Sequence, residues 1–311
     1  MAAKPPLRLG TRGSPLALAQ AELVAKALGD AEPVPISTSG DEGRDGGEHL
    51  PAGDKARFVR EIEAALLARE VDLAVHSAKD LPGELPDGLE IAGVPAREDP
   101  RDVYVGSGDS LDDVPDGATV GTSSLRRRAQ LLASRTDLEI VPIRGNVDTR
   151  LRKLAEDGMA GIVLAAAGLL RLGRETEVAF TFPAEVLTPA PGQGAIAIEA
   201  RSDDEPTFAR AQTVTDRGAL AELSCERAAV AGLNASCDTP LGVNASIERD
   251  RMRVRGFCGL PDGSDWIRDE IEADASEPEA LGALLARRML GAGAAELLER
   301  AEAMARQGAG S

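Results

Sequence analysis

Aromatic residues are nearly absent from this 311-residue chain: Phe, Trp and Tyr together make up 2% of it. Proteins that hold single-stranded nucleic acid stack bases on such rings, so the composition argues against that class. Basic residues are also in deficit, with 35 Lys and Arg against 52 Asp and Glu, which gives a net charge of −17. Because a surface of this sign repels phosphate backbones and anionic membranes, we expect neither nucleic acid nor a membrane as a partner.

Cysteine is scarce as well. The three cysteines, Cys225, Cys237 and Cys258, are too few and odd in number for a disulfide framework, and none belongs to a Cys-x-x-Cys pair. We therefore expect no metal site and a reducing compartment. No apolar run approaches the roughly 20 residues of a membrane span, and the first nine residues lack a signal-peptide pattern. These absences predict a soluble, cytoplasmic protein.

Strand-like apolar segments alternate with helical patterns over the first two thirds of the chain. We expect strands at 6–10, 71–75, 119–121, 139–143 and 161–165, and helices at 15–28, 58–67, 124–131 and 147–154. Ser14 is the expected N-cap of the first helix, and Ser123 or Ser124 that of the third. This alternation predicts parallel sheets covered by helices. Beyond about Arg217, one helix, alternating strands and a long C-terminal helix indicate a smaller α+β domain.

Two segments rich in proline or glycine predict joints between domains. Residues 95–100 (PAREDP) have a proline at each end, and residues 189–194 (PAPGQG) combine proline with glycine. We therefore divide the chain into a discontinuous first lobe, a second lobe and a C-terminal domain. Their expected ranges are 1–96 with 194–216, 97–193, and 217–311.

Arginines recur where the expected strands end. From Gly121 to Arg174 there are ten bases and five acids, a local charge of +5 in an acidic chain. In open α/β sheets, ligands bind at the carboxyl ends of strands, and guanidinium groups pair carboxylates through two parallel hydrogen bonds. The pattern predicts a cleft for a ligand with several carboxylates or phosphates, and the alternative is solvated helix faces with salt bridges. The arginines in this pattern are Arg12, Arg126, Arg127, Arg128, Arg144, Arg150, Arg152 and Arg171.

A polar turn and a polar loop supply two further candidates. Lys79 and Asp80 follow the strand expected at 71–75, and a carboxylate among cations stays ionised and can stabilise a cation that forms on a substrate. A helix-capping aspartate is the alternative, and we interpret His76 as structural. Cys237 is the best nucleophile candidate of the three cysteines because it lies in a polar loop, although an unreactive thiol is the simpler interpretation.

Eight segments, in this order, resemble the porphobilinogen deaminase family over nearly the whole chain. They are TRGSPLAL (11–18), HSAKDLP (76–82), REDPRD (97–102), GTSSLRR (121–127), RGNVDTR (144–150), AAAGLLR (165–171), PAPGQGA (189–195) and the Cys237 loop. The resemblance implies an α/β fold with two periplasmic-binding-protein-like lobes, a cleft between them and a small C-terminal domain. It implies a transferase, hydroxymethylbilane synthase, which condenses four porphobilinogen molecules head to tail into a linear tetrapyrrole for haem and porphyrin biosynthesis and releases ammonia.

The resemblance also implies roles for single residues. Cys237 is expected to hold one dipyrromethane cofactor covalently, and Asp80 to be the catalytic carboxylate. The expected cofactor-binding residues are Lys79, Thr122, Ser124, Arg126, Arg127, Arg144 and Gly145. The expected substrate-binding residues are Arg12, Ser14, Lys55, Arg150 and Arg171. Porphobilinogen is the expected partner of a monomeric enzyme.

The chain departs from the family pattern at two places. Gly53-Asp-Lys-Ala-Arg57 replaces a Gly-Lys-Gly turn after residues 41–54, a segment that is either a surface insertion or a lid. Ser236 stands where the family has a glycine before the cysteine. A two-lobed sensor of a polycarboxylate would share the arginines and joints but would not need Asp80 or Cys237. A transcription regulator's effector domain is disfavoured because no helix-turn-helix extension is present.

Overall fold

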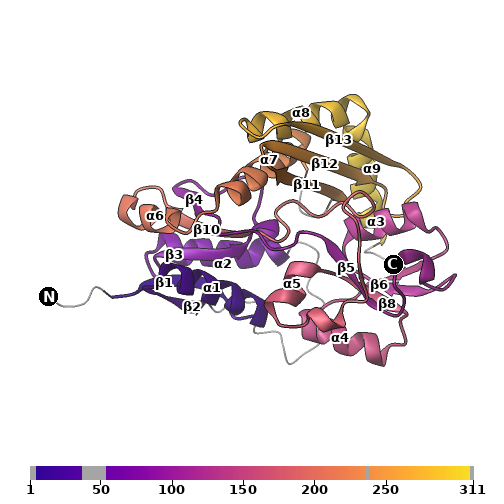
Figure 1. The fold of residues 1–311 in the computed structure, drawn as a ribbon, viewed down its shortest axis with the longest axis horizontal. Coiled ribbons are helices and arrows are strands. Elements are labelled where there is room, and N and C mark those ends of the chain that lie inside the picture. Colours follow the sequence, from indigo (N-terminus) through magenta and orange to yellow (C-terminus); the bar gives the residue numbers. More distant parts are fainter. Residues whose placement is uncertain (1–4, 37–53, 236–238, 309–311) are drawn as a thin grey trace. The chain divides into compact units, whose positions relative to one another are not determined.

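The computed structural model describes residues 5–36, 54–235 and 239–308, and it gives no side-chain description at 54–57. The chain divides into two compact units. Unit 1 is Met1–Glu98 with Ala195–Leu220, and unit 2 is Asp99–Gly194 with Ala221–Ser311. The chain passes between the units three times, after Glu98, Gly194 and Leu220, and the first two crossings fall in the segments 95–100 and 189–194. Figure 1 labels most of the helices and strands of both units.

Unit 1 contains a five-stranded sheet in the order β2-β1-β3-β10-β4. Its strands are β1 (Leu7–Arg12), β2 (Ala31–Ile36), β3 (Leu73–Ser77), β4 (Leu89–Gly93) and β10 (Ile196–Arg201). β1 is parallel to β2 and β3, whereas β10 is antiparallel to β3 and β4. The helices of this unit are α1 (Pro15–Leu28), α2 (Asp54–Leu67) and α6 (Glu205–Gln212), with the 3-10 turn η2 (Ala78–Asp80).

The side chains of β3 alternate between two cores. Leu73 and Val75 belong to the cluster that includes Val24 of α1, whereas Ala74 belongs to the cluster that includes Ile62 of α2. Because side chains alternate along a strand, His76 lies on the α2 side with Ala74. The buried side chains of Glu63, His76 and Glu199 all lie on the α2 side of the sheet.

Unit 2 repeats this topology in a second sheet, in the order β7-β6-β8-β5-β9. Its strands are β5 (Asp102–Gly106), β6 (Thr119–Gly121), β7 (Glu139–Val141), β8 (Gly161–Ala165) and β9 (Phe180–Thr181). The helical segments of this part are α3 (Leu125–Ser134), α4 (Val147–Glu156), α5 (Ala166–Arg171), η3 (Leu111–Asp113) and η4 (Glu175–Glu177). In each sheet, the strand that follows a joint (β10 or β5) is antiparallel to its neighbours. The two five-stranded sheets, one in each unit, therefore share one strand order.

Unit 2 also contains a three-stranded antiparallel sheet covered by helices. The strands are β11 (Leu241–Glu248), β12 (Arg251–Gly259) and β13 (Trp266–Asp274), and the helices are α7 (Arg217–Leu233), α8 (Pro278–Gly291) and α9 (Ala294–Gly308). α7 begins in the last residues of unit 1. Val243, Val254 and Leu285 form part of one buried core. Gly282 lets α8 approach α7 closely, since a Cβ there would collide with the backbone of Cys225.

The expected fold class, two α/β lobes and a small α+β domain, is confirmed. The single long C-terminal helix is wrong: α8 and α9 are separated at Ala292 and Gly293, and Gly293 has a φ of 99°, which a helix cannot contain. The expected caps are correct, because the Ser14 hydroxyl accepts from the N–H of Ala17, and Ser124, rather than Ser123, caps α3. Within the described residues, no helix is both long and apolar enough to cross a membrane.

Candidate active site

The part of the candidate site in unit 1 lies at the carboxyl ends of β1 and β3. These strands are parallel neighbours, with Leu9 opposite Leu73. Arg12 ends β1, and Lys79 and Asp80 occupy η2 directly after β3. The N–H of Ala78 donates to the carbonyl of Ala195 over 3.0 Å, which fixes the start of the turn. The structure therefore brings Arg12, Ser14, Lys79 and Asp80 to one edge of the sheet, as the alternation of strands and helices predicts.

Arg12 is held by an aromatic ring. Its guanidinium carbon lies 3.7 Å from the centre of the Phe58 ring of α2, a cation–π contact. The Nε atom of Arg12 is buried and has no hydrogen-bond partner among the described residues. A buried N–H without an acceptor is costly, so this donor fits a site that takes an anionic or carbonyl oxygen.

The part of the candidate site in unit 2 is built around a carboxylate that sequence reasoning did not select. Asp102, the first residue of β5, is fully buried. Its Oδ2 lies 2.7 Å from Nη1 of Arg126, and its Oδ1 accepts from Nη2 of Arg127 over 2.7 Å. Gln193, from the second joint, donates to the same Oδ1 over 2.9 Å. Burial raises the pKa of Asp102, but the charges of Arg126 and Arg127 outweigh burial and bring the pKa to about 2.

Arg126 and Arg127 thus have a structural role that the sequence interpretation did not include. Arg126 also donates to the carbonyl of Thr188, and Arg127 to the carbonyl of Val163. Two guanidinium groups face one carboxylate, so the cluster keeps a positive charge. Nε of Arg126 is buried without a hydrogen-bond partner among the described residues. Contact of these two arginines with a cofactor stays a prediction. The net positive charge of the cluster and this unpaired Nε of Arg126 favour it.

The other candidates of unit 2 lie near the beginnings of α3 and α4 and at the end of α5. The Nε of Arg150 donates to the carbonyl of Gly145 over 2.8 Å, and burial together with the charge of Arg127 lowers the pKa of Arg150 to about 10. Gly145 has a φ of 118°, and a Cβ there would collide with the Thr149 side chain, so glycine is required. Arg171 donates to the carbonyl of Gly194 in the second joint over 2.6 Å.

The remaining candidates in this part differ in exposure. Thr122 is buried, and its hydroxyl accepts from the N–H of Ser124, which in turn caps α3. Arg144 is exposed at the end of the β7 segment. The structure therefore gathers the unit 2 candidates at the ends of β6, β7 and β8, although it buries them to different degrees.

Two of the three cysteines are unsuited to nucleophilic chemistry. Cys225 and Cys258 are fully buried, and burial raises the pKa of each thiol to about 12. A thiol with such a pKa is almost entirely protonated at neutral pH. Cys237 and its neighbours, the segment 41–53 and the Lys55 side chain lie outside the described residues.

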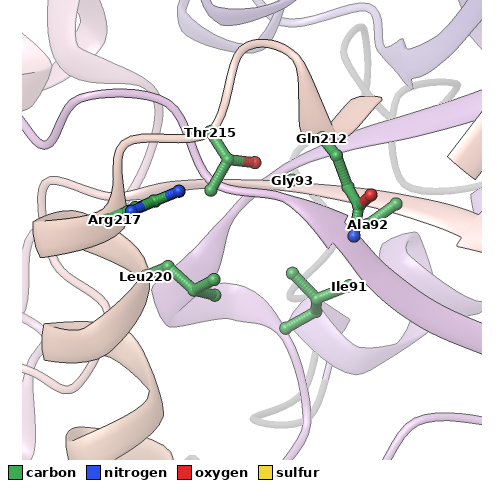
Figure 2. A pocket seen from close by; sticks show the side chains of 7 residues that line it. All are labelled: Ile91, Ala92, Gly93, Gln212, Thr215, Arg217 and Leu220. Carbon is green, nitrogen blue, oxygen red and sulfur yellow. The ribbon is translucent and has the colours of Figure 1, made fainter. Parts of the chain in front are cut away.

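The described residues contain no group of three His, Cys, Asp or Glu side chains that could hold a metal ion. A cavity of about 330 Å³ lies in unit 1 between β4 and the segment before α7 (Figure 2). Ile91 and Leu220 face it together with Thr215 and Arg217, and none of the candidate residues lines it. The site is therefore defined by the donors at the strand ends and not by this cavity.

Comparison with known proteins identifies the family of this chain. The family model for "Porphobilinogen deaminase, dipyromethane cofactor binding domain" matches residues 7–209, and that for "Porphobilinogen deaminase, C-terminal domain" matches residues 220–291. A porphobilinogen deaminase of Thermus thermophilus is 48% identical over 299 residues, covering 93% of this chain and 97% of the relative. One of Pelotomaculum thermopropionicum is 43% identical over 302 residues, covering 95% of this chain and 96% of the relative.

Solved structures give only a distant likeness. The L-cystine solute receptor of Neisseria gonorrhoeae, in its unliganded open conformation, matches with a TM-score of 0.39 and 14% identity, over 68% of this chain and 85% of the receptor. This match is too weak to bear on the lobes or their ligand. The family models and the two relatives, in contrast, span nearly the whole sequence, and this chain belongs to the porphobilinogen deaminase family.

Proposed function

We propose that this protein joins four porphobilinogen molecules head to tail, with release of one ammonia at each step, to give hydroxymethylbilane. The observation that carries the proposal is the match to both domain models of the family, combined with the placement of Arg12 and Asp80 at the same edge of the unit 1 sheet. A sensor of a polycarboxylate would not need an acid at that turn. Release of ammonia from porphobilinogen distinguishes the two functions.

We also propose the three-domain division 1–96 with 194–216, 97–193, and 217–311. Three separate sheets support it, as does the interval between the two family models at residues 209 and 220. The enzyme is further inferred to work in the cytoplasm as a monomer with porphobilinogen as its partner. The two free thiols of Cys225 and Cys258 suit a reducing compartment.

A dipyrromethane carries acetate and propionate side chains. A site that fits it must therefore offer many hydrogen-bond donors to carboxylate groups. The buried Nε of Arg126 has no acceptor among the described residues, and burial lowers the pKa of Arg150, which a bound carboxylate would raise again. These donors fit the group. We assign it to Cys237 by a thioether, with its carboxylates on Lys79, Thr122, Ser124, Arg126, Arg127, Arg144 and Gly145. When bound, it supplies the terminal α-carbon to which the first substrate is joined.

Asp80 is the proposed catalytic carboxylate. In each condensation the aminomethyl C–N bond of porphobilinogen breaks, ammonia leaves, and a positive charge develops on the pyrrole. A carboxylate that accepts the pyrrole N–H stabilises this charge, and Asp80 then takes the ring proton displaced when the C–C bond forms. Arg12, Ser14, Lys55, Arg150 and Arg171 bind the substrate's two carboxylates and hold its methylene carbon in place.

The test is Asp80→Asn, which keeps the shape of the side chain and removes its charge. We expect turnover, measured as ammonia release and porphobilinogen consumption, to fall by about 10²–10³-fold, because a positioned charge in a transition state contributes that much. The circular dichroism spectrum should not change. Asp87→Asn, an exposed aspartate of the same unit, should keep the parent rate. Near-parent turnover of Asp80→Asn would place the catalytic carboxylate elsewhere.

A further inference from the structure

Three titratable side chains of unit 1 are buried in the core and take no part in the chemistry described above. They are Glu63 of α2, His76 of β3 and Glu199 of β10, with exposed fractions of 2%, 5% and 0%. Nε2 of His76 lies 2.8 Å from Oε2 of Glu199. Glu199 pairs with Ala74, two residues before His76, so both side chains lie on the α2 face as diagonal neighbours. The pair links β3 to β10 inside the core.

The two carboxylates of this cluster are not equivalent. Burial raises the pKa of Glu63, and the negative charge of Glu199 raises it further, against weaker opposing effects of His76 and Arg60. Oε1 of Glu63 is buried and has no hydrogen-bond partner among the described residues. Both carboxylate oxygens of Glu199 and Nε2 of His76 are likewise buried without a hydrogen bond of good geometry among the described residues, although Nε2 and Oε2 approach to 2.8 Å. A buried carboxylate next to another carboxylate favours its neutral form, so burial and the charge of Glu199 act on Glu63 in the same direction.

The charged groups on the other elements that pack against α2 do not change this assignment. Arg201 of β10 donates to the carbonyls of Leu66 and Val71, and Arg12 stacks on Phe58. β2 contributes apolar side chains to this face. Besides the cluster itself, the charged residues of α2 and of the elements packed against it are Arg8, Arg12, Glu32, Asp54, Lys55, Arg57, Arg60, Glu61, Lys79, Asp80 and Arg201.

The pair lies directly before the catalytic turn. Only Ser77 separates His76 from η2, and the N–H of Ala78 donates to the carbonyl of Ala195, the residue before β10. The β3–β10 pairing runs up to Ser77 opposite Ile196, and the Ala78–Ala195 hydrogen bond and the His76–Glu199 pair add to it directly before the turn. We propose that His76 and Glu199 are positioning residues that hold Asp80 in its working place, and that Glu63 lies beside them as a neutral carboxylic acid. The positioning role rests on the proposed function.

Two isosteric variants test the proposal, since glutamine imitates a neutral carboxylic acid and not a carboxylate. We expect Glu199→Gln to lower kcat for porphobilinogen by about 10–100-fold, because a small displacement of a catalytic group costs that much. Its KM should stay within about threefold of the parent value, since the substrate-binding cations are untouched. Glu63→Gln should keep kcat within about twofold. Intact mass and circular dichroism spectra verify that both variants carry the same covalent group and fold as the parent.

Thermal unfolding adds a measurement that does not depend on activity. An acid whose pKa is raised by folding costs stability as pH rises through its unfolded pKa towards its folded pKa, and glutamine removes that cost. The Tm of Glu63→Gln relative to the parent should therefore increase from pH 4.5 to pH 8.

Four results would overturn the inference: parent-like kcat in Glu199→Gln, equal loss of kcat in both variants, a KM change as large as the kcat change, or a pH-independent Tm difference. A parent that releases no ammonia refutes the proposed function and the positioning role together. The Tm series then still decides the protonation of Glu63.

Discussion

Replacing Asp102 by asparagine should destabilise this protein more than any surface charge replacement. Asp102 is fully buried and accepts hydrogen bonds from Arg126, Arg127 and Gln193. Asparagine has nearly the same shape, but it leaves two buried guanidinium groups without a counter-charge. Removal of one partner from a buried ion pair costs about 3–5 kcal/mol, because the remaining charge stays desolvated.

The pKa of Asp102 gives a second measure of the same effect. Folding lowers it from 3.8 to about 2, and a difference of this size corresponds to about 2 kcal/mol of stability. Because the folded pKa is the lower one, this stability is fully present above about pH 4 and is lost as pH falls towards 2. The difference between the parent and Asp102→Asn should therefore be largest near neutral pH and shrink below pH 4.

The assay is urea unfolding followed by circular dichroism at pH 7 and at pH 3.5. The matched control is Asp265→Asn, which breaks an exposed pair with Arg300 at 2.9 Å. Exposed pairs contribute little, so this control should unfold close to the parent midpoint. An Asp102→Asn midpoint equal to that of Asp265→Asn, or a difference that does not depend on pH, would refute the assignment of Asp102 as the buried counter-charge.

Two further predictions concern the site. Arg150→Leu should lower kcat/KM for porphobilinogen by at least about 30-fold, because about 2 kcal/mol or more of carboxylate binding is lost. Arg152 is an exposed arginine on the same helix that pairs with Glu156, and Arg152→Leu should keep the parent value. Equal effects of the two variants would place the anion site elsewhere. In a Cys237→Ala variant, a thiol reagent at pH 8 should label neither Cys225 nor Cys258 until the protein is denatured, because both thiols are buried with pKa values of about 12. Labelling of the native variant would contradict their assignment as core residues.

Local patterns predicted β1, β3, β6, β7 and β8 and the helices α1 to α4, but β2, β4, β5, β9 and β10 were not predicted, and α2 begins at Asp54 and not at residue 58. Ser14 and Ser124 act as caps because a hydroxyl before a helix can accept a free backbone N–H, which is a property of neighbouring residues. The joints were predictable in the same way, since proline and glycine interrupt regular structure wherever they cluster.

Non-local pairing was not predictable. The side chains of Arg126 and Arg127 look like any exposed helical arginines in the sequence, and their partner Asp102 lies 24 residues away from Arg126. The sequence offered one indication of this pairing. Arg126 and Arg127 follow the end of a strand, and the expected joint at 95–100 contains the acidic residues Glu98 and Asp99. The strands β5 and β10 were not predicted at all, and their reversed directions could not have been, because side-chain alternation is the same for both strand directions. The division of the C-terminal helix depended on one glycine, Gly293, inside an otherwise helical pattern.

The central claim is that Cys237 carries a dipyrromethane with which the enzyme builds its product, and the intact mass of the purified protein tests it most directly. Protein made in a host that produces porphobilinogen should be heavier than its sequence mass by two porphobilinogen units less two molecules of ammonia. Cys225→Ala and Cys258→Ala should retain this added mass, and Cys237→Ala should lack it together with all activity. Added mass that persists in Cys237→Ala, or that is absent from the parent protein, would contradict the account.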